Sequence, residues 1–186
     1  MPCSEFELGL KKEVTERLKG LGLPAAEHCI VVSIDQQKLW FFEGTHCETF
    51  VVSTARAGRG CVQDSHQTPD GLHRVAEKFG DGAASGMVFK ARQSTGKLSA
   101  EWPTPEDNLI TSRILWLEGL EPGHNQGTDA SGRVVDTHRR YVYIHGTNQA
   151  DKLGQPNSHG CVLLSDQDVI RLYGRVASGT PVLIRD

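Results

Sequence analysis

The segment HGTNQADKLGQPNSHGC, at residues 145–161, gathers side chains that could carry out nucleophilic chemistry. It begins with His145 and ends with Cys161, and His159 stands two residues before the cysteine. A cysteine attacks a carbonyl only as its thiolate, and its free pKa of ~8.5 leaves little thiolate at neutral pH unless a base or a dipole assists. Either histidine could be that base. The residue types therefore indicate a cysteine nucleophile beside an imidazole.

The loop between the two ends contains glycine, proline and asparagine, so the chain can double back within it. We therefore expect the imidazole of His145 to come within proton-transfer distance of the sulfur of Cys161, in an open groove. Gly160 lacks a side chain, so backbone N–H groups could approach an oxyanion that forms next to the sulfur.

Zinc is the competing interpretation of this segment, because histidine and cysteine are its usual ligands. A structural zinc site needs four ligands, and the segment shows no obvious fourth. We expect the remaining cysteines and histidines to be buried or simply exposed residues without a chemical role: Cys3, Cys29, Cys47, Cys61, His28, His46, His66, His73, His124 and His138. Five cysteines without a C-x-x-C pair indicate neither a disulfide framework nor a zinc knuckle. We predict no metal site and no cofactor.

The elements that must position this segment are mostly β-strands. Short runs rich in β-branched and aromatic residues (CIVVSI, KLWFFE, CETFVVST, LHRVA, MVFKA, LITSRILWLEG and TPVLIRD) predict strands. The alternation in RYVYIHG places Tyr141, Tyr143 and His145 on one face of a strand that ends at the histidine. The polar residues 55–67 and 121–140 predict loops.

Two helices flank the predicted strands. Ser4 and Glu7 form a capping-box pattern before apolar residues at helical spacing, which predicts a helix over residues 4–20. Ser165 and Asp168 repeat the pattern before a second apolar face, and Gly179 lies just beyond the predicted end of that helix.

The whole chain of 186 residues suits one soluble domain, and its net charge of -3 argues against nucleic-acid binding. No apolar run is long enough for a membrane span. The N-terminal residues, with Glu5 and Glu7, do not resemble a secretory signal, so we expect a cytoplasmic protein. It would be periplasmic if the natural chain carries a signal that has been removed.

Ser158-His159-Gly160-Cys161, together with HGTN at residues 145–148, resembles the signature of the L,D-transpeptidase catalytic domain (YkuD-like) family. The resemblance continues from the hairpin that starts near Cys29, through TPDG at residues 68–71, to the final GTPVLI. It implies a mainly β fold with flanking helices and two packed mixed sheets. The implied organisation is an N-terminal helical extension at residues 1–27 and a catalytic domain at residues 28–186.

The resemblance also implies a bacterial enzyme that acts on a peptidoglycan stem peptide or muropeptide. By position, Cys161 is the nucleophile and His145 the general base, which a carbonyl at Gly146 would orient. The nucleophile would attack the L,D-peptide bond between the third stem residue and the following D-alanine.

Three further motif residues receive roles from the same resemblance: His159 and Gly160 would shape the oxyanion site, and Ser158 would buttress the loop. Leu163 departs from the family, because many members carry arginine or asparagine two positions after the cysteine. Arg56, Arg59 and Arg92 could replace such a group as carboxylate ligands, but the sequence assigns none of them.

The acceptor of the acyl group determines the reaction. Because the N-terminus shows no export signal, we expect an L,D-carboxypeptidase that trims recycled muropeptides with water as acceptor. The alternative is an L,D-transpeptidase that forms peptidoglycan crosslinks in the periplasm with an amine as acceptor. A second alternative, suggested by Leu163, is an inactive peptidoglycan-binding module.

Overall fold

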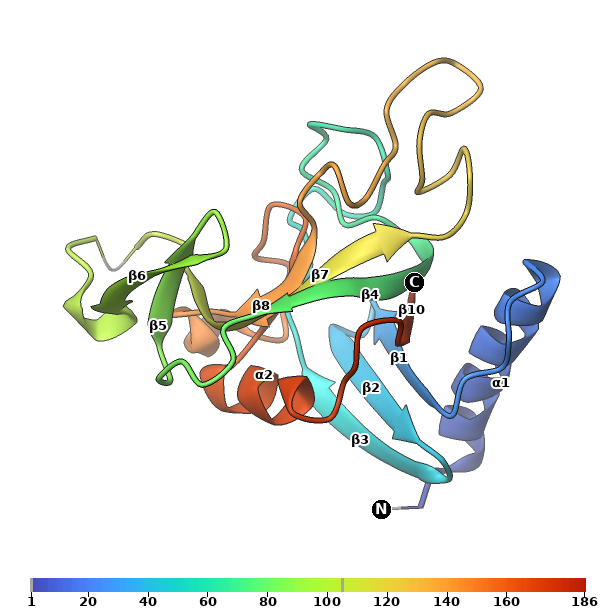
Figure 1. The fold of residues 1–186 in the computed structure, drawn as a ribbon, viewed down its shortest axis with the longest axis horizontal. Coiled ribbons are helices and arrows are strands. Elements are labelled where there is room, and N and C mark those ends of the chain that lie inside the picture. The colour runs from blue at the N-terminus through green and yellow to red at the C-terminus, as the bar shows by residue number, and fades with distance from the viewer. Residues whose placement is uncertain (1, 105) are drawn as a thin grey trace.

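Ten strands and two α-helices form the fold of residues 2–104 and 106–186, the part of the chain that the computed structural model describes (Figure 1). Residue 1, the first of the predicted N-terminal extension, lies outside these ranges. The helices are α1 (Glu5–Gly20) and α2 (Asp166–Tyr173), with short 3-10 turns at Ser99–Glu101 and Ala150–Lys152. The strands are β1 (His28–Ser33), β2 (Lys38–Glu43), β3 (His46–Val51), β4 (Gly71–Phe79), β5 (Met87–Lys90), β6 (Gln93–Leu98), β7 (Ile110–Gly119), β8 (Tyr143–Gly146), β9 (Val162–Leu164) and β10 (Pro181–Arg185).

The strands form one continuous mixed sheet in the order β3-β2-β1-β10-β4-β7-β5-β6, and β8 and β9 extend it from the other edge of β7. This sheet curls, so its β1–β3 part and its β7–β9 part do not share a plane (Figure 1). The main core lies between them, because Ile30 and Phe41 from the first part pack in one cluster with Ile144 and Val162 from the second. The predicted fold class, mainly β with flanking helices and two packed mixed layers, is confirmed in this curled form.

Helix α1 begins where the sequence predicts. The side chain of Ser4 accepts a hydrogen bond from the Glu7 N–H, and the Glu7 carboxylate accepts one from the Ser4 N–H at 2.8 Å, which completes the capping box. Its apolar face, formed by Leu10, Val14 and Leu18, packs in a second cluster with aromatic residues of β2. The helix therefore covers the outer face of the β1–β2 region, at the opposite end of the molecule from the β5–β6 hairpin (Figure 1).

Two predicted boundaries are wrong, and two strands, β6 and the three-residue β9, escaped prediction. Strand β8 begins at Tyr143, because Tyr141 has a positive φ of 55° and is 54% exposed, outside the ladder. Helix α2 ends at Tyr173, well before Gly179, although Val176 beyond its end still packs in the core. Strand β6 has a polar sequence, QSTGKL, with mostly exposed side chains, so hydrophobic alternation could not reveal it.

No helix within the described ranges combines the length and the apolar character needed to cross a membrane.

Candidate active site

The two ends of the motif meet on neighbouring parallel strands. In the ladder of β8 and β9, Ile144 pairs with Val162 and His145 pairs with Leu163. Cys161 directly precedes β9, and the Tyr143 N–H donates a hydrogen bond to its sulfur at 3.4 Å. Because parallel strands need a crossover connection, the intervening loop at 147–160 brings these distant residues into register.

The reactive side chains lie on the same face of this ladder. Ile144 and Val162 point into the main core, whereas Tyr143 and Cys161 belong to a different cluster. Side chains alternate along a strand, so His145 points to the face of Tyr143 and of Cys161. The two reactive residues are therefore close neighbours on one face of this parallel ladder.

His145 is held as a neutral imidazole with one defined tautomer. It is 3% exposed, and its Nδ1 lies 2.8 Å from the carbonyl oxygen of Gly146. A carbonyl can only accept, so Nδ1 carries the proton and Nε2 keeps its lone pair. Burial lowers the pKa of this imidazole to about 4, although the Gly146 carbonyl opposes the shift. The residue therefore has the protonation state that a general base needs at neutral pH.

Cys161 is half-buried and carries its proton in this conformation. Its S–H donates to the Tyr141 carbonyl at 3.8 Å, and burial raises the pKa of the thiol to about 11 despite the Tyr143 N–H and the nearby cation of Arg140. Among the hydrogen bonds of the described residues, none joins this sulfur to the imidazole of His145. Catalytic hydrogen bonds are often long before substrate binds, so the pair is positioned but not yet engaged. The arrangement fits proton transfer during attack, not a preformed thiolate.

Position 146, next to the general-base candidate His145, has no room for a side chain. A Cβ at this position would lie 2.6 Å from the Thr111 carbonyl oxygen and 2.9 Å from Oδ1 of Asp166. That carboxylate oxygen also accepts hydrogen bonds from Thr111 Oγ1 at 2.6 Å and from Ser112 Oγ. The carbonyl that orients His145 is therefore fixed between β7 and the first turn of α2.

The residues before the cysteine form a tight, internally bonded turn. Ser158 is buried, donates to the Cys161 carbonyl at 2.6 Å and accepts from the Gly160 N–H at 3.1 Å, so it buttresses the loop. Thr68 donates to the Gly160 carbonyl at 3.0 Å from the neighbouring loop. The N–H of Gly160 is thus occupied in this conformation. Its predicted part in the oxyanion site stays a prediction, and it would require this bond to open.

Next to the cysteine is a depression of about 310 Å³. Its lining residues are Gln63, Asp64, His66, Arg139, Arg140, Tyr141 and His159. His159 is exposed there, with its ring centroid 6.0 Å from that of His66. Two arginines and two histidines against one aspartate make this depression a suitable place for an anionic group.

Arg140 was not singled out by the sequence, although it contributes to the site. Its guanidinium donates to the carbonyls of Gly60 at 3.1 Å and Gln67 at 2.7 Å, and it holds the loop that packs on Gly160. Its position three residues before β8 was the available signal, but an arginine in a polar loop is usually a solvated charge.

The three arginines left unassigned by the sequence lie in different places. Arg92 donates to the Tyr143 hydroxyl at 3.0 Å and stacks over the Trp116 ring at 4.5 Å, so it belongs to the surroundings of the site. Arg56 donates to Asn157 at 2.5 Å, within the crossover loop. Arg59 pairs with Asp186 at the C-terminus. Leu163 is 1% exposed, so the position after the motif is part of the interior.

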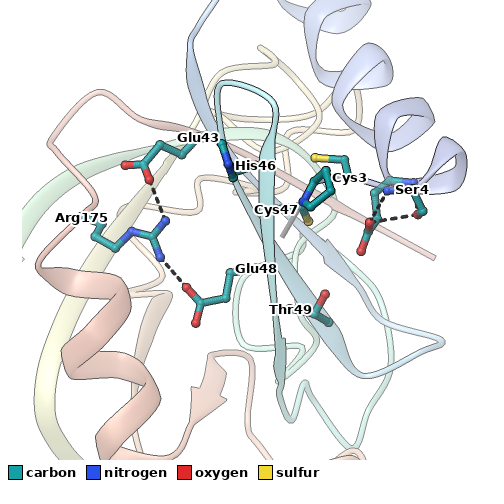
Figure 2. Close-up of a pocket in the computed structure, with 10 residues that line it drawn as sticks. Cys3, Ser4, Glu43, His46, Cys47, Glu48, Thr49 and Arg175 are labelled. Atoms are coloured by element: carbon teal, nitrogen blue, oxygen red, sulfur yellow. Dashed lines mark hydrogen bonds and ion pairs between the residues drawn. The ribbon is translucent and has the colours of Figure 1, made fainter.

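Another cavity, of about 660 Å³, is lined by residues outside this site. It is bounded by the start of α1 and the β2–β3 hairpin, and Arg175 spans it by pairing with both Glu43 and Glu48 (Figure 2). None of its lining residues belongs to the segment 145–161. Cavity volume alone therefore does not locate the chemistry.

The family model of the L,D-transpeptidase catalytic domain (YkuD) matches residues 27–184. This match covers most of the chain, and the chain therefore belongs to that family.

Two relatives from Bacillus subtilis (strain 168), YqjB and YkuD, carry the names of L,D-transpeptidases. YqjB is 38% identical over 75 residues, which are 38% of this chain and 40% of the relative. YkuD is 29% identical over 91 residues, which are 49% of each chain. The matched segment thus spans less than half the length of either relative.

Solved structures show the same fold. L,D-transpeptidase 3 from Mycobacterium tuberculosis, in complex with a faropenem-derived adduct, has a TM-score of 0.54 at 18% identity over 86% of this chain and 60% of its own. An L,D-transpeptidase from Mycobacterium smegmatis has a TM-score of 0.51 at 16% identity over 88% of this chain and 61% of its own.

Proposed function

We propose that this chain is a cysteine acyl-enzyme that cleaves the L,D-peptide bond between the third residue and the D-alanine of peptidoglycan stem tetrapeptides. The observation that carries the proposal is the neutral His145, fixed through Gly146, on the same face as Cys161 of the adjacent strand. Membership of the L,D-transpeptidase family supports the substrate class.

The chemistry proceeds through a thioester. Nε2 of His145 takes the thiol proton as Sγ of Cys161 attacks the carbonyl carbon of the third stem residue, and a tetrahedral oxyanion forms. The C–N bond then breaks, and the imidazolium returns its proton to the departing amine of D-alanine. The neutral imidazole is thereby restored for the second half of the reaction.

The acyl group then passes to one of two acceptors. Water gives L,D-carboxypeptidation, the trimming of recycled muropeptides that the sequence led us to expect in the cytoplasm. An amine of a second stem peptide gives a periplasmic crosslink, and the names of the relatives favour this outcome. His145 can deprotonate either acceptor, so one enzyme mechanism serves both.

The substrate would lie across the depression next to the cysteine. Stem peptides end in a carboxylate, and Arg139 is exposed at this depression. Its guanidinium takes part in none of the ion pairs between residues that the structure describes, so its charge is available to a ligand. Arg140 would hold the wall of the depression through its bonds to the backbone of the loop at 60–67.

Mass analysis after incubation with a stem tetrapeptide or its disaccharide form tests the proposal. Loss of one alanine indicates hydrolysis, and dimers indicate transfer. Cys161→Ala should abolish either product, and His145→Gln should slow its formation by about 10²–10⁴-fold, the usual contribution of a general base. Unchanged substrate with the wild-type protein over a range of pH would refute both reactions.

Labelling with a carbapenem separates an enzyme from an inactive binding module. We expect one covalent adduct by intact mass on the wild-type protein and none on Cys161→Ala. Cys47→Ala, which removes a different half-buried thiol, should keep the adduct. An adduct that persists in Cys161→Ala would place the reactive thiol elsewhere.

A further inference from the structure

A second group of potential metal ligands lies outside the proposed active site. Cys61, Asp70 and His124 come from three separate segments: the loop after β3, the residue before β4, and the turn after β7. Their donor atoms all lie within 4.8 Å of one another. No local spacing in the sequence joins them, because 9 and 54 positions separate consecutive members.

The distances between the donor atoms match those of a tetrahedral site. Sγ of Cys61 lies 3.4 Å from Oδ1 of Asp70 and 3.9 Å from Nε2 of His124, and Nε2 of His124 lies 3.2 Å from Oδ1 of Asp70. Zinc bonds of about 2.3 Å to sulfur and about 2.0–2.1 Å to nitrogen or oxygen, at the tetrahedral angle, require donor separations of about 3.3–3.6 Å. Each observed distance therefore needs a shift of only about 0.3 Å or less to surround one ion.

The charges and the exposure also suit a bound dication. A thiolate and a carboxylate together supply two negative charges, and the neutral imidazole adds a third donor. Oδ2 of Asp70 faces Arg59 at 3.8 Å, and this arginine also pairs with Asp186, so its charge is already shared with another carboxylate. The oxygen that faces Cys61 and His124 is the other one, Oδ1.

One side of the cluster is open. Cys61 is buried at 8% exposure, whereas the His124 side chain is 49% exposed and borders a cavity of about 510 Å³. Three protein ligands with a solvent-facing fourth position are the arrangement of an open zinc site, in which water or a small ligand completes the tetrahedron. The mixture of sulfur, nitrogen and oxygen donors favours zinc over magnesium or calcium.

We infer that Cys61, Asp70 and His124 bind one zinc-class divalent cation, with a solvent molecule as the fourth ligand. The ion would join the loop after β3 to the turns that flank β4 and β7. This site is separate from Cys161 and does not depend on the proposed reaction.

Titration with Zn²⁺ tests the inference in a reduced, chelator-treated Cys161→Ala protein, in which the motif cysteine cannot bind metal. Calorimetry should show one equivalent bound. Co²⁺ should produce the sulfur-to-metal absorption and the visible bands of a tetrahedral thiolate site. Cys61→Ser and His124→Gln should each weaken Zn²⁺ binding by at least about 10–100-fold, because loss of a direct ligand costs no less than loss of its supporting partner.

Cys47→Ala is the matched control, since it removes a thiol of the Cys3–Cys47 region instead, and its binding should be unchanged (Figure 2). Full binding in both Cys61→Ser and His124→Gln, or loss of binding in Cys47→Ala alone, would overturn the inference. Equal binding of Mg²⁺ would overturn the assigned class of cation. If circular dichroism shows that Cys61→Ser is unfolded, the exposed His124→Gln decides the result.

Discussion

Acid should weaken the folded state through two buried histidines, at pH values where carboxylates contribute little. His145 and His73 are both enclosed, and burial lowers the pKa of each imidazole from 6.5 to about 4. His73 lies outside the site, with Nδ1 at 3.0 Å from the Gly71 carbonyl and Nε2 at 3.1 Å from the Thr137 hydroxyl. Burial therefore lowers the pKa of one histidine inside the candidate active site and of one histidine outside it by the same amount.

The direction in which stability changes with pH depends on whether the folded or the unfolded state binds the proton at the higher pH. As the pH falls below about 6.5, the unfolded chain protonates these histidines, whereas the folded protein leaves them neutral until about pH 4. The stability they provide is thus complete above pH 6.5 and is lost on acidification. A difference of about 2.5 pKa units corresponds to about 3 kcal/mol for each histidine by pH 4, with a slope of about 1.4 kcal/mol per pH unit.

Urea unfolding at intervals between pH 7.5 and 5 measures this slope. We expect the free energy of unfolding of the wild-type protein to be level near pH 7.5 and to fall by about 2.3 kcal/mol between pH 6 and 5. His145→Asn and His73→Asn should each lower this slope by about half, whatever their own effect on stability. A level profile between pH 6.5 and 5, or an unchanged slope in both variants, would refute the reasoning.

Three further outcomes follow from the geometry of the site and of α1. Gly146→Ala should cost about 1–3 kcal/mol by thermal unfolding, because its Cβ would lie 2.9 Å from Asp166 Oδ1, and it should also reduce turnover. Thr68→Val leaves the Gly160 carbonyl without its 3.0 Å donor, so we expect about 1–3 kcal/mol of destabilisation and slower carbapenem acylation; unchanged acylation would contradict a role in positioning the motif. In Gly9→Ala, the added Cβ would meet no atom within 4 Å, and alanine loses less backbone entropy than glycine in the interior of α1. The free energy of unfolding should therefore rise by about 0.5–1 kcal/mol in the same assay, and a decrease would contradict this reasoning.

The features that the sequence predicted correctly depend on local chemistry. The capping box of Ser4 and Glu7 starts α1 because both partners lie within one turn of each other. The resemblance of SHGC at residues 158–161 correctly indicated the family, and the predicted contact of His145 with the Gly146 carbonyl is present because it joins adjacent residues.

The features that escaped prediction depend on contacts between distant segments. The parallel pairing of β8 with β9 follows from a crossover whose path no local pattern specifies. Arg140 reaches the carbonyls of Gly60 and Gln67 across more than 70 positions of sequence. The positive φ of Tyr141 interrupts an alternation that by itself predicted a longer strand.

Strand β9 is only three residues long, yet both of its edges are occupied. β8 pairs with it on one side, and on the other side Leu163 exchanges backbone hydrogen bonds with Ser53 at 2.8 and 3.0 Å. The amides that follow Cys161 should therefore be among the slowest of the chain to exchange with deuterium. Before the cysteine, Ser158 is still bonded to the backbone of Thr54 and Arg56, whereas the N–H and the carbonyl of Gly160 are bonded to the hydroxyl groups of Ser158 and Thr68. Cys161 thus lies between a strand with backbone bonds on both edges and a glycine bonded to two hydroxyl groups, so we expect any movement that admits a peptide to begin at Gly160.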